Sequence, residues 1–145
     1  YIAGLINSFM KKVNLIFLLL PLITLAQNVL TVHVVGVESN NGSVLIGVYD
    51  TDETFLEEGK EVGEGASKAS MGETIVTIKD LPNGTYALAI FHDVNDNEEL
   101  DTNFLGIPKE PLCFSIGKLR TFGPPLFKEC AFLVEKDTSI KVELE

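Results

Sequence analysis

Apolar and polar residues alternate along much of this chain with the two-residue period of β-strands. Leu30, Val32 and Val34, for example, are separated by Thr31 and His33. This period is typical of a half-buried strand, because successive side chains point to opposite faces. The segment 44–49 is apolar at nearly every position and is predicted to be a central strand. The pattern predicts seven strands, at residues 30–34, 44–49, 74–79, 85–92, 112–116, 131–134 and 140–144.

The segments between these strands carry turn residues and almost no helical periodicity. Asn41-Gly42 favours a tight turn with positive φ, and residues 81–84 read Leu-Pro-Asn-Gly. One short helix is predicted between Asp52 and Glu58. Residues 59–72 hold four glycines and are predicted to be an exposed connection, without the spacing of a phosphate-binding loop. Seven short strands predict an all-β fold, namely a seven-stranded antiparallel β-sandwich.

Residues 1–26 have a different character from the remainder. Met10, Lys11 and Lys12 precede an apolar run, and Thr24 and Ala26 occupy the −3 and −1 positions of a cleavage site. This pattern predicts an upstream extension (1–9) plus a cleaved signal peptide, followed by a single domain at 27–145. An uncleaved anchor is the alternative, but the apolar run is short for a membrane span. We therefore expect a secreted or periplasmic protein with no integral membrane span in its mature form.

The net charge excludes several classes of partner. The chain has 21 acidic and 11 basic residues, so its net charge is −10. Loss of residues 1–26 removes Lys11 and Lys12 but no acid, and the charge becomes −12. This charge disfavours binding to nucleic acid or to anionic membranes. Two histidines and two cysteines are too few for a cysteine-rich zinc site or a dense disulfide scaffold.

The segment 92–103 is the strongest candidate for chemistry. Asp93, Asn95 and Asn97 place oxygen-bearing side chains at alternate positions, and Asp101 follows at the ninth. The pattern D-x-[DN]-x-[DN] opens an EF-hand-type loop. Calcium takes six to eight oxygen ligands, which such a loop can supply by wrapping around the ion. The sequence predicts calcium bound by the side chains of Asp93, Asn95, Asn97 and Asp101 and by the backbone carbonyl of Glu99.

Two positions depart from that pattern. Glu98 stands at the sixth position, where glycine normally permits a sharp turn, and Phe104 stands at the twelfth, normally a bidentate glutamate. The alternative is a solvated acidic turn, because Asn and Asp favour turns through local hydrogen bonds. Five acids within 93–101 repel one another unless something neutralises them, which favours a bound cation.

The residues from Leu81 onward resemble a known bacterial family. Residues 81–93, which read LPNGTYALAIFHD, resemble the L-P-x-G-x-Y-A-x-x-x-x-H-D core of the family filed as domain of unknown function 2141. The similarity continues at Asn95 and Asn97 and in the segments 100–110, 114–115 and 122–127. The resemblance implies an exported, single-domain, prealbumin-like or immunoglobulin-like sandwich without an established activity. It also implies that H-D-x-N-x-N is the hallmark loop, although Asp96 and Glu98 replace the glycines of the usual N-G-N-G.

Cys113 and Cys130 lie 17 positions apart, and two arrangements remain open for them. In an exported protein they could form a disulfide, which for a loop of this length would contribute about 3 kcal/mol. They could equally be two separately buried thiols, because the sequence does not give the distance between their Cα atoms. Neither has a histidine beside it in sequence that would indicate a nucleophile.

His92 and two proline-containing loops complete the candidates. His92 ends the strongest predicted strand, beside Asp93, and a role in orienting the loop is favoured over a catalytic dyad. The loops 106–111 and 122–125 are expected to pack on one another and on the acidic segment. The alternative for these loops is a recognition surface for an unknown protein, peptide or glycan.

Three hypotheses about function follow. The first is a non-enzymatic exported module whose acidic loop binds Ca²⁺ for structural ordering. The second is a metal-free binding or adhesion domain that uses the loops within 106–125. The third is a hydrolase centred on His92. The prealbumin-like fold does include one hydrolase family, but its histidine and arginine motifs are absent here, so we expect no enzymatic activity.

Overall fold

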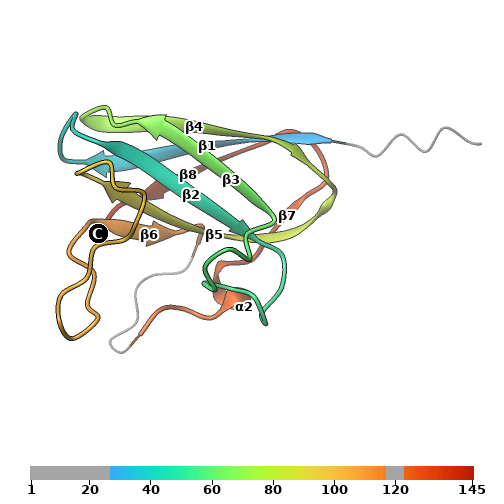
Figure 1. Ribbon diagram of the computed structural model, residues 1–145. Helices are drawn as coiled ribbons and strands as arrows, with labels where there is room; N and C mark the ends of the chain where they lie inside the picture. The colour runs from blue at the N-terminus through green and yellow to red at the C-terminus, as the bar shows by residue number, and fades with distance from the viewer. Residues whose placement is uncertain (1–26, 117–122) are drawn as a thin grey trace, which may run out of the picture.

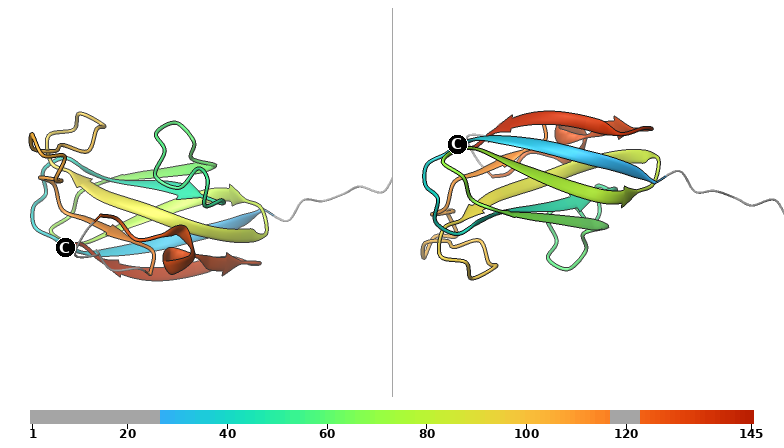
Figure 2. Two further views of the ribbon diagram at one scale, coloured as in Figure 1. Left: turned by 90° about the horizontal axis from the view of Figure 1, so that it is seen from below. Right: turned by 90° about the horizontal axis from the view of Figure 1, so that it is seen from above.

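The computed structural model describes residues 27–116 and 123–145, and the predicted extension and signal peptide at 1–26 lie outside this range. The described chain forms two β-sheets that pack face to face (Figures 1 and 2). The elements in chain order are β1 (Asn28–Val37), β2 (Ser43–Tyr49), β3 (Gly63–Lys68), β4 (Gly72–Leu81), β5 (Gly84–Asp93), β6 (Leu112–Phe114), α2 (Phe127–Cys130), β7 (Phe132–Val134) and β8 (Thr138–Glu143).

The smaller sheet has the order β4-β1-β8, and the larger has the order β3-β2-β5-β6, with β7 also pairing with β5. β6 and β7 share one edge of β5, because β7 pairs with residues 84–86 and β6 with residues 89–91. The predicted all-β sandwich is confirmed. Eight strands are present in the described residues rather than seven, and β1 and β8 pair in parallel, so the sheets are not purely antiparallel.

The core lies between the sheets and follows the alternation seen in the sequence. Leu30, Val32 and Val34 of β1 are fully buried against Leu88 and Ile90 of β5 within one cluster. Their burial is the main stabilising contribution, at roughly 1.5–3 kcal/mol for each side chain. The outward positions of β1 remain partly exposed, as a half-buried strand requires.

The prediction of an exposed connection at residues 59–72 is wrong over its central part, because this segment contains β3. The strand pairs with β2 along its whole length, from Ser43↔Lys68 to Val48↔Gly63. Its half-buried positions are Gly63, Gly65 and Ser67. A Cβ at Gly65 would lie 2.7 Å from a side-chain carbon of Ile78, so the inward positions must be small. Such a strand has no apolar period to detect.

The predicted helix between Asp52 and Glu58 is also wrong. These residues form turns, in which the Thr54 amide bonds to the Thr51 hydroxyl and Leu56 adopts a φ of +66° that ends any helical path. The turn instead carries Phe55 onto the outer face of the larger sheet. There the Phe55 ring makes edge contacts with three aromatic rings, those of Tyr49, Phe114 and Phe127. The turn and α2 thus cover that outer face.

Cys113 and Cys130 are not joined by a disulfide. Both are buried, but Cys113 belongs to the core between the sheets and Cys130 to the cluster on the outer face. The second of the two arrangements left open by the sequence is therefore the observed one. Burial, followed by the negative charge of Glu145, raises the pKa of the Cys113 thiol to about 12.

We expect Cys113 to be inert toward thiol reagents in the folded protein. In a Cys130→Ser background, labelling should be at least about 100-fold slower than in denaturant, because it requires local opening. The folded-state thiol, with a pKa of about 12, contributes little thiolate at pH 7 to 9, so labelling should proceed through the opened state and should accelerate with pH as it does for an exposed thiol. Ellman's reagent measures both quantities. Rapid labelling of the native protein would contradict this burial.

The loops that follow β5 lie at one end of the sandwich, and the chain enters β1 at the opposite end (Figures 1 and 2). In the described part of the chain, no helix has the length and apolar content that crossing a bilayer requires.

Candidate functional site

The acidic loop, defined here as residues 93–101, begins at the last residue of β5. Asp93 pairs with Ser43 across the β2–β5 ladder, so the start of the loop is fixed to the sheet. The Asn41-Gly42 turn lies directly beneath it: a Cβ on Gly42 would come within 1.8 Å of the Asp93 carbonyl oxygen. Gly42 has a φ of +72°, as the sequence predicts for this turn.

Asp93 organises the first half of the loop. Its side chain is only 1% exposed, and its two carboxylate oxygens accept hydrogen bonds from the backbone amides of Asn97 at 3.1 Å and Glu98 at 2.8 Å. These charge-assisted bonds offset the cost of burying the carboxylate. The chain therefore curls around this one side chain.

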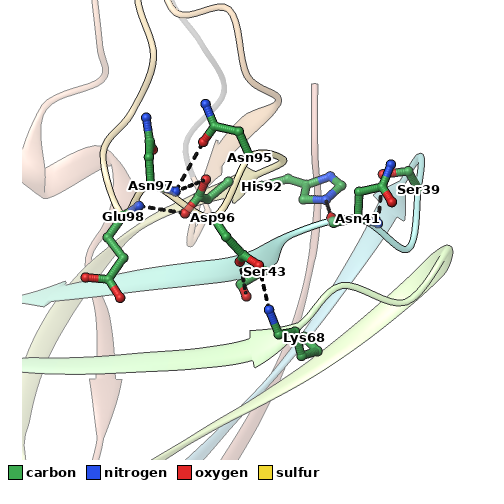
Figure 3. A network of polar contacts seen from close by, with 10 residues as sticks. Ser39, Asn41, Ser43, Lys68, His92, Asn95, Asp96, Asn97 and Glu98 are labelled. Atoms are coloured by element: carbon green, nitrogen blue, oxygen red, sulfur yellow. Dashed lines mark hydrogen bonds and ion pairs between the residues drawn. The ribbon is translucent and has the colours of Figure 1, made fainter.

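Figure 3 shows the bonds made by the Asn97 and Glu98 amides, and two further side-chain oxygens continue the same arrangement. Asn95 Oδ1 accepts a bond from the Asn97 amide at 3.2 Å, and Asn97 Oδ1 accepts one from the Glu99 amide at 3.0 Å. Across the loop, Asn95 Nδ2 donates to Asp101 Oδ2 at 2.8 Å. The side chains of Asn95 and Asp101 therefore contact each other, and Asp93 and Asn97 belong to the same local network. Each of these oxygens accepts one hydrogen bond from a described residue and has a second lone pair.

The positions expected to need glycine keep the corresponding backbone. Asp96 has a φ of +56° and Glu98 a φ of +63°, both in the left-handed region. This conformation costs a residue other than glycine roughly 1–2 kcal/mol. Asp96 gains compensating contacts, because Lys68 Nζ lies 2.6 Å and Ser43 Oγ 2.8 Å from its carboxylate. The bonds from Lys68 and Ser43 lower the pKa of the Asp96 carboxyl, so it stays ionised to a lower pH than an isolated carboxyl.

Glu110 joins the two ends of the acidic loop. Its carboxylate accepts the Val94 amide at 2.9 Å on one oxygen and the Asp101 amide at 3.0 Å on the other. The sequence analysis missed Glu110, Ser43 and Lys68. Ser43 reaches the loop through the pairing of β2 with β5, Lys68 through the pairing of β3 with β2, and Glu110 lies beyond an intervening turn. No local sequence pattern signals these contacts.

His92 lies inside the sandwich, at the end of β5, and supports the start of the acidic loop. The residue is 1% exposed, and its Nε2 lies 2.8 Å from the Asn41 carbonyl oxygen, to which it donates. Nδ1 is buried without a hydrogen-bond partner among the described residues. A general base must reach a substrate or water. The observed contact instead ties the end of β5 to the Asn41-Gly42 turn, in keeping with the orienting role.

The loop 106–111 does not pack as predicted at its tip. Ile107 is 55% exposed, and the turn is held by polar contacts to Asn103 instead of apolar burial. Phe122 of the second loop lies outside the described residues, and the packing predicted for it on the first loop stays a prediction. The first loop is joined to the acidic segment through the Glu110 carboxylate.

The predicted calcium ligands fall into two kinds. Asp93 and Asp101 supply carboxylates, whereas Asn95 and Asn97 supply amide oxygens and Glu99 supplies a backbone carbonyl. Among the described residues, no three histidine, cysteine or acidic side chains gather closely enough to hold a metal by themselves. Any site here therefore depends on the neutral oxygens as well, which calcium accepts more readily than transition metals do.

A family model matches residues 32–141, which run from β1 to β8 and include the acidic loop. The family is described as uncharacterised proteins conserved in bacteria, domain of unknown function 2141. The chain belongs to this family. No curated protein and no solved structure matches the chain. The structure thus assigns to this member of the domain of unknown function 2141 family a two-sheet sandwich whose acidic loop continues directly from β5.

Proposed function

We propose that this protein is an exported, non-enzymatic β-sandwich module that binds calcium in its acidic loop. The observation that carries the proposal is the backbone of that loop. Asp96 and Glu98 adopt the left-handed conformation that glycine would otherwise supply, so the departure from the glycine pattern leaves the curled path available. The amide bonds to Asp93, Asn95 and Asn97 support the same path.

Calcium would bind on the remaining lone pairs of these oxygens. The ligands are Asp93, Asn95, Asn97, the Glu99 carbonyl and Asp101. Asp101 Oδ2 now accepts a bond from the Asn95 amide nitrogen, so binding requires the Asn95 amide to turn its oxygen toward the ion. The ion would also reduce repulsion from the exposed carboxylates of Glu98 and Glu99. We assign the bound ion a role in ordering the loop and not in catalysis. His92, the candidate catalytic residue, has no exposed surface that a substrate could reach.

Thermal unfolding tests this proposal. Every described strand and contact lies within 28–145, so we would use the chain from Gln27 onward. If the dissociation constant is about 10 μM, about 1 mM calcium should stabilise the fold by roughly 2.7 kcal/mol relative to excess chelator. For a domain of this size, that is a rise in Tm of about 10 °C. Magnesium should give a much smaller rise.

Glu99→Gln is the matched control. It removes one acid from the same loop but keeps the Glu99 carbonyl, so the calcium-induced rise in Tm should persist. Asp101→Ala, which removes a proposed carboxylate ligand, should reduce the rise to about half or less. A wild-type Tm that is the same in calcium and in chelator would show that the acidic loop is a metal-free turn.

A metal-free binding or adhesion domain remains the second candidate. It is favoured by exposed apolar side chains within 106–125, where Ile107 and Ile116 are largely accessible. Pull-down from envelope extracts separates the two functions. A partner retained in excess chelator and lost on Ile107→Ser would favour the second, whereas capture that requires calcium would favour the first.

A further inference from the structure

The most exposed apolar side chains in the described chain form a tip directly after the acidic loop. This apolar tip is residues 104–107, Phe-Leu-Gly-Ile. Phe104 is 95% exposed and Leu105 68% exposed, so Phe104 has almost no contact with its own molecule and Leu105 is largely accessible. The segment projects from the end of the sandwich opposite the start of β1 (Figure 1). Exposed apolar groups gathered in this way mark a site of interaction.

The backbone of the apolar tip is held by several internal hydrogen bonds. Asn103 Oδ1 accepts bonds from the amides of Leu105 at 2.9 Å and Ile107 at 3.0 Å. The Gly106 amide donates to the Asn103 carbonyl at 2.9 Å, and the Asn103 amide donates to the Ile107 carbonyl at 2.8 Å. Unpaired amides are costly in a lipid phase, and these are paired internally.

The base of the apolar tip is also fixed in advance. Thr102 and Pro108 form an isolated bridge, and the Lys109 amide donates to the Asp101 carbonyl at 2.8 Å. The tip is therefore a small hairpin whose base adjoins the clamp that Glu110 forms on Asp101. Because the conformation is already ordered, docking would incur little of the entropy cost that a flexible loop incurs.

Charge restricts the surface on which such a tip can dock. The neighbouring acidic loop exposes Asp96, Glu98 and Glu99, and the chain as a whole carries −10. An anionic surface would repel this end of the molecule. A zwitterionic phospholipid surface would not, because its ammonium groups lie outside the phosphates and would face the carboxylates. The pairing of an apolar tip with an acidic surround fits that arrangement of charges.

We propose that the apolar tip docks on a zwitterionic phospholipid bilayer and inserts Phe104 and Leu105 into its interfacial layer. The tip is convex and only four residues long, which suits shallow insertion of about 5–10 Å and not the flat complementarity of a protein interface. The acidic loop lies at the headgroup level. The inference does not rest on calcium binding and is tested in excess chelator.

The chain has no tryptophan, so Phe104→Trp introduces a unique fluorescent reporter. Its control is Leu133→Trp, because Leu133 is 58% exposed on β7, which pairs with the other end of β5. Using the chain from Gln27, phosphatidylcholine vesicles should shift the emission of Phe104→Trp to shorter wavelength and leave that of Leu133→Trp unchanged. Brominated lipid should quench the first reporter only.

Vesicle sedimentation supplies the second readout. Phe104→Ser/Leu105→Ser should weaken partitioning by at least about tenfold, whereas Val62→Ser/Leu133→Ser, which also removes two exposed apolar side chains, should change it less than about twofold. Inclusion of anionic phosphatidylglycerol should weaken wild-type binding. The proposal is overturned if the wild type does not sediment with zwitterionic vesicles, if the tip variant binds as well as the wild type, or if anionic lipid strengthens binding.

Discussion

Replacement of Gly42 by alanine is expected to destabilise the fold by about 3–5 kcal/mol. A Cβ at this position would lie 1.8 Å from the Asp93 carbonyl oxygen and 2.8 Å from two backbone carbons. All of these atoms belong to the backbone at the start of the acidic loop, so no side-chain rotation relieves the clash. The left-handed φ of +72° adds strain for alanine.

Gly59→Ala separates the clash from the strain. Gly59 has the same φ of +72°, but a Cβ there would meet nothing within 4 Å. Its substitution should cost only the strain, about 1–2 kcal/mol. Urea denaturation of both variants measures the difference. Equal losses would show that the Asn41-Gly42 turn does not press against Asp93 as the structure has it.

The sequence predicted those parts of the fold in which local and global preferences agree. The Asn41-Gly42 turn, the alternation in β1 and the strand β5 appear where expected, because half-buried strands and tight turns leave direct patterns in the residues. β3 was missed for the opposite reason. The sheets approach closely there, so Gly65 occupies an inward position that an apolar residue usually marks. Close packing between the sheets requires small residues at the inward positions of β3, and small residues leave no apolar pattern in the sequence.

The residues of the candidate site were likewise predicted only in part. Asp93, Asn95 and Asn97 were identified because their bonds are local, joining side chains to amides two to five residues ahead. The contacts of Lys68 and Glu110 were not identified, because they depend on strand pairing and on a hairpin that returns to the loop. Periodicity and spacing do not encode such contacts, although these are the ones that hold the loop on the sandwich.

Asp93→Ala is expected to separate the ordering of the acidic loop from its binding of calcium. In excess chelator, this variant should lose about 2–4 kcal/mol of unfolding free energy, because the amides of Asn97 and Glu98 would lose the acceptor that satisfies them. Asp101→Ala should lose less than about 1 kcal/mol, because Asp101 is only half-buried and accepts a single side-chain bond. Denaturation of both variants in chelator gives this comparison.

Calcium affinity should not follow that order. Both variants remove a proposed carboxylate ligand, so calorimetric titration should show at least about a tenfold loss of affinity in each. If Asp93 shapes the loop but the loop binds no ion, the two variants would still differ in stability, and the wild type would show no calcium binding in the titration. An Asp101→Ala variant that retained wild-type affinity would remove Asp101 from the ligand set. We propose that the Asp93 carboxylate both shapes the loop and binds the ion. This requires that both variants lose calcium affinity and that Asp93→Ala accounts for most of the loss of stability.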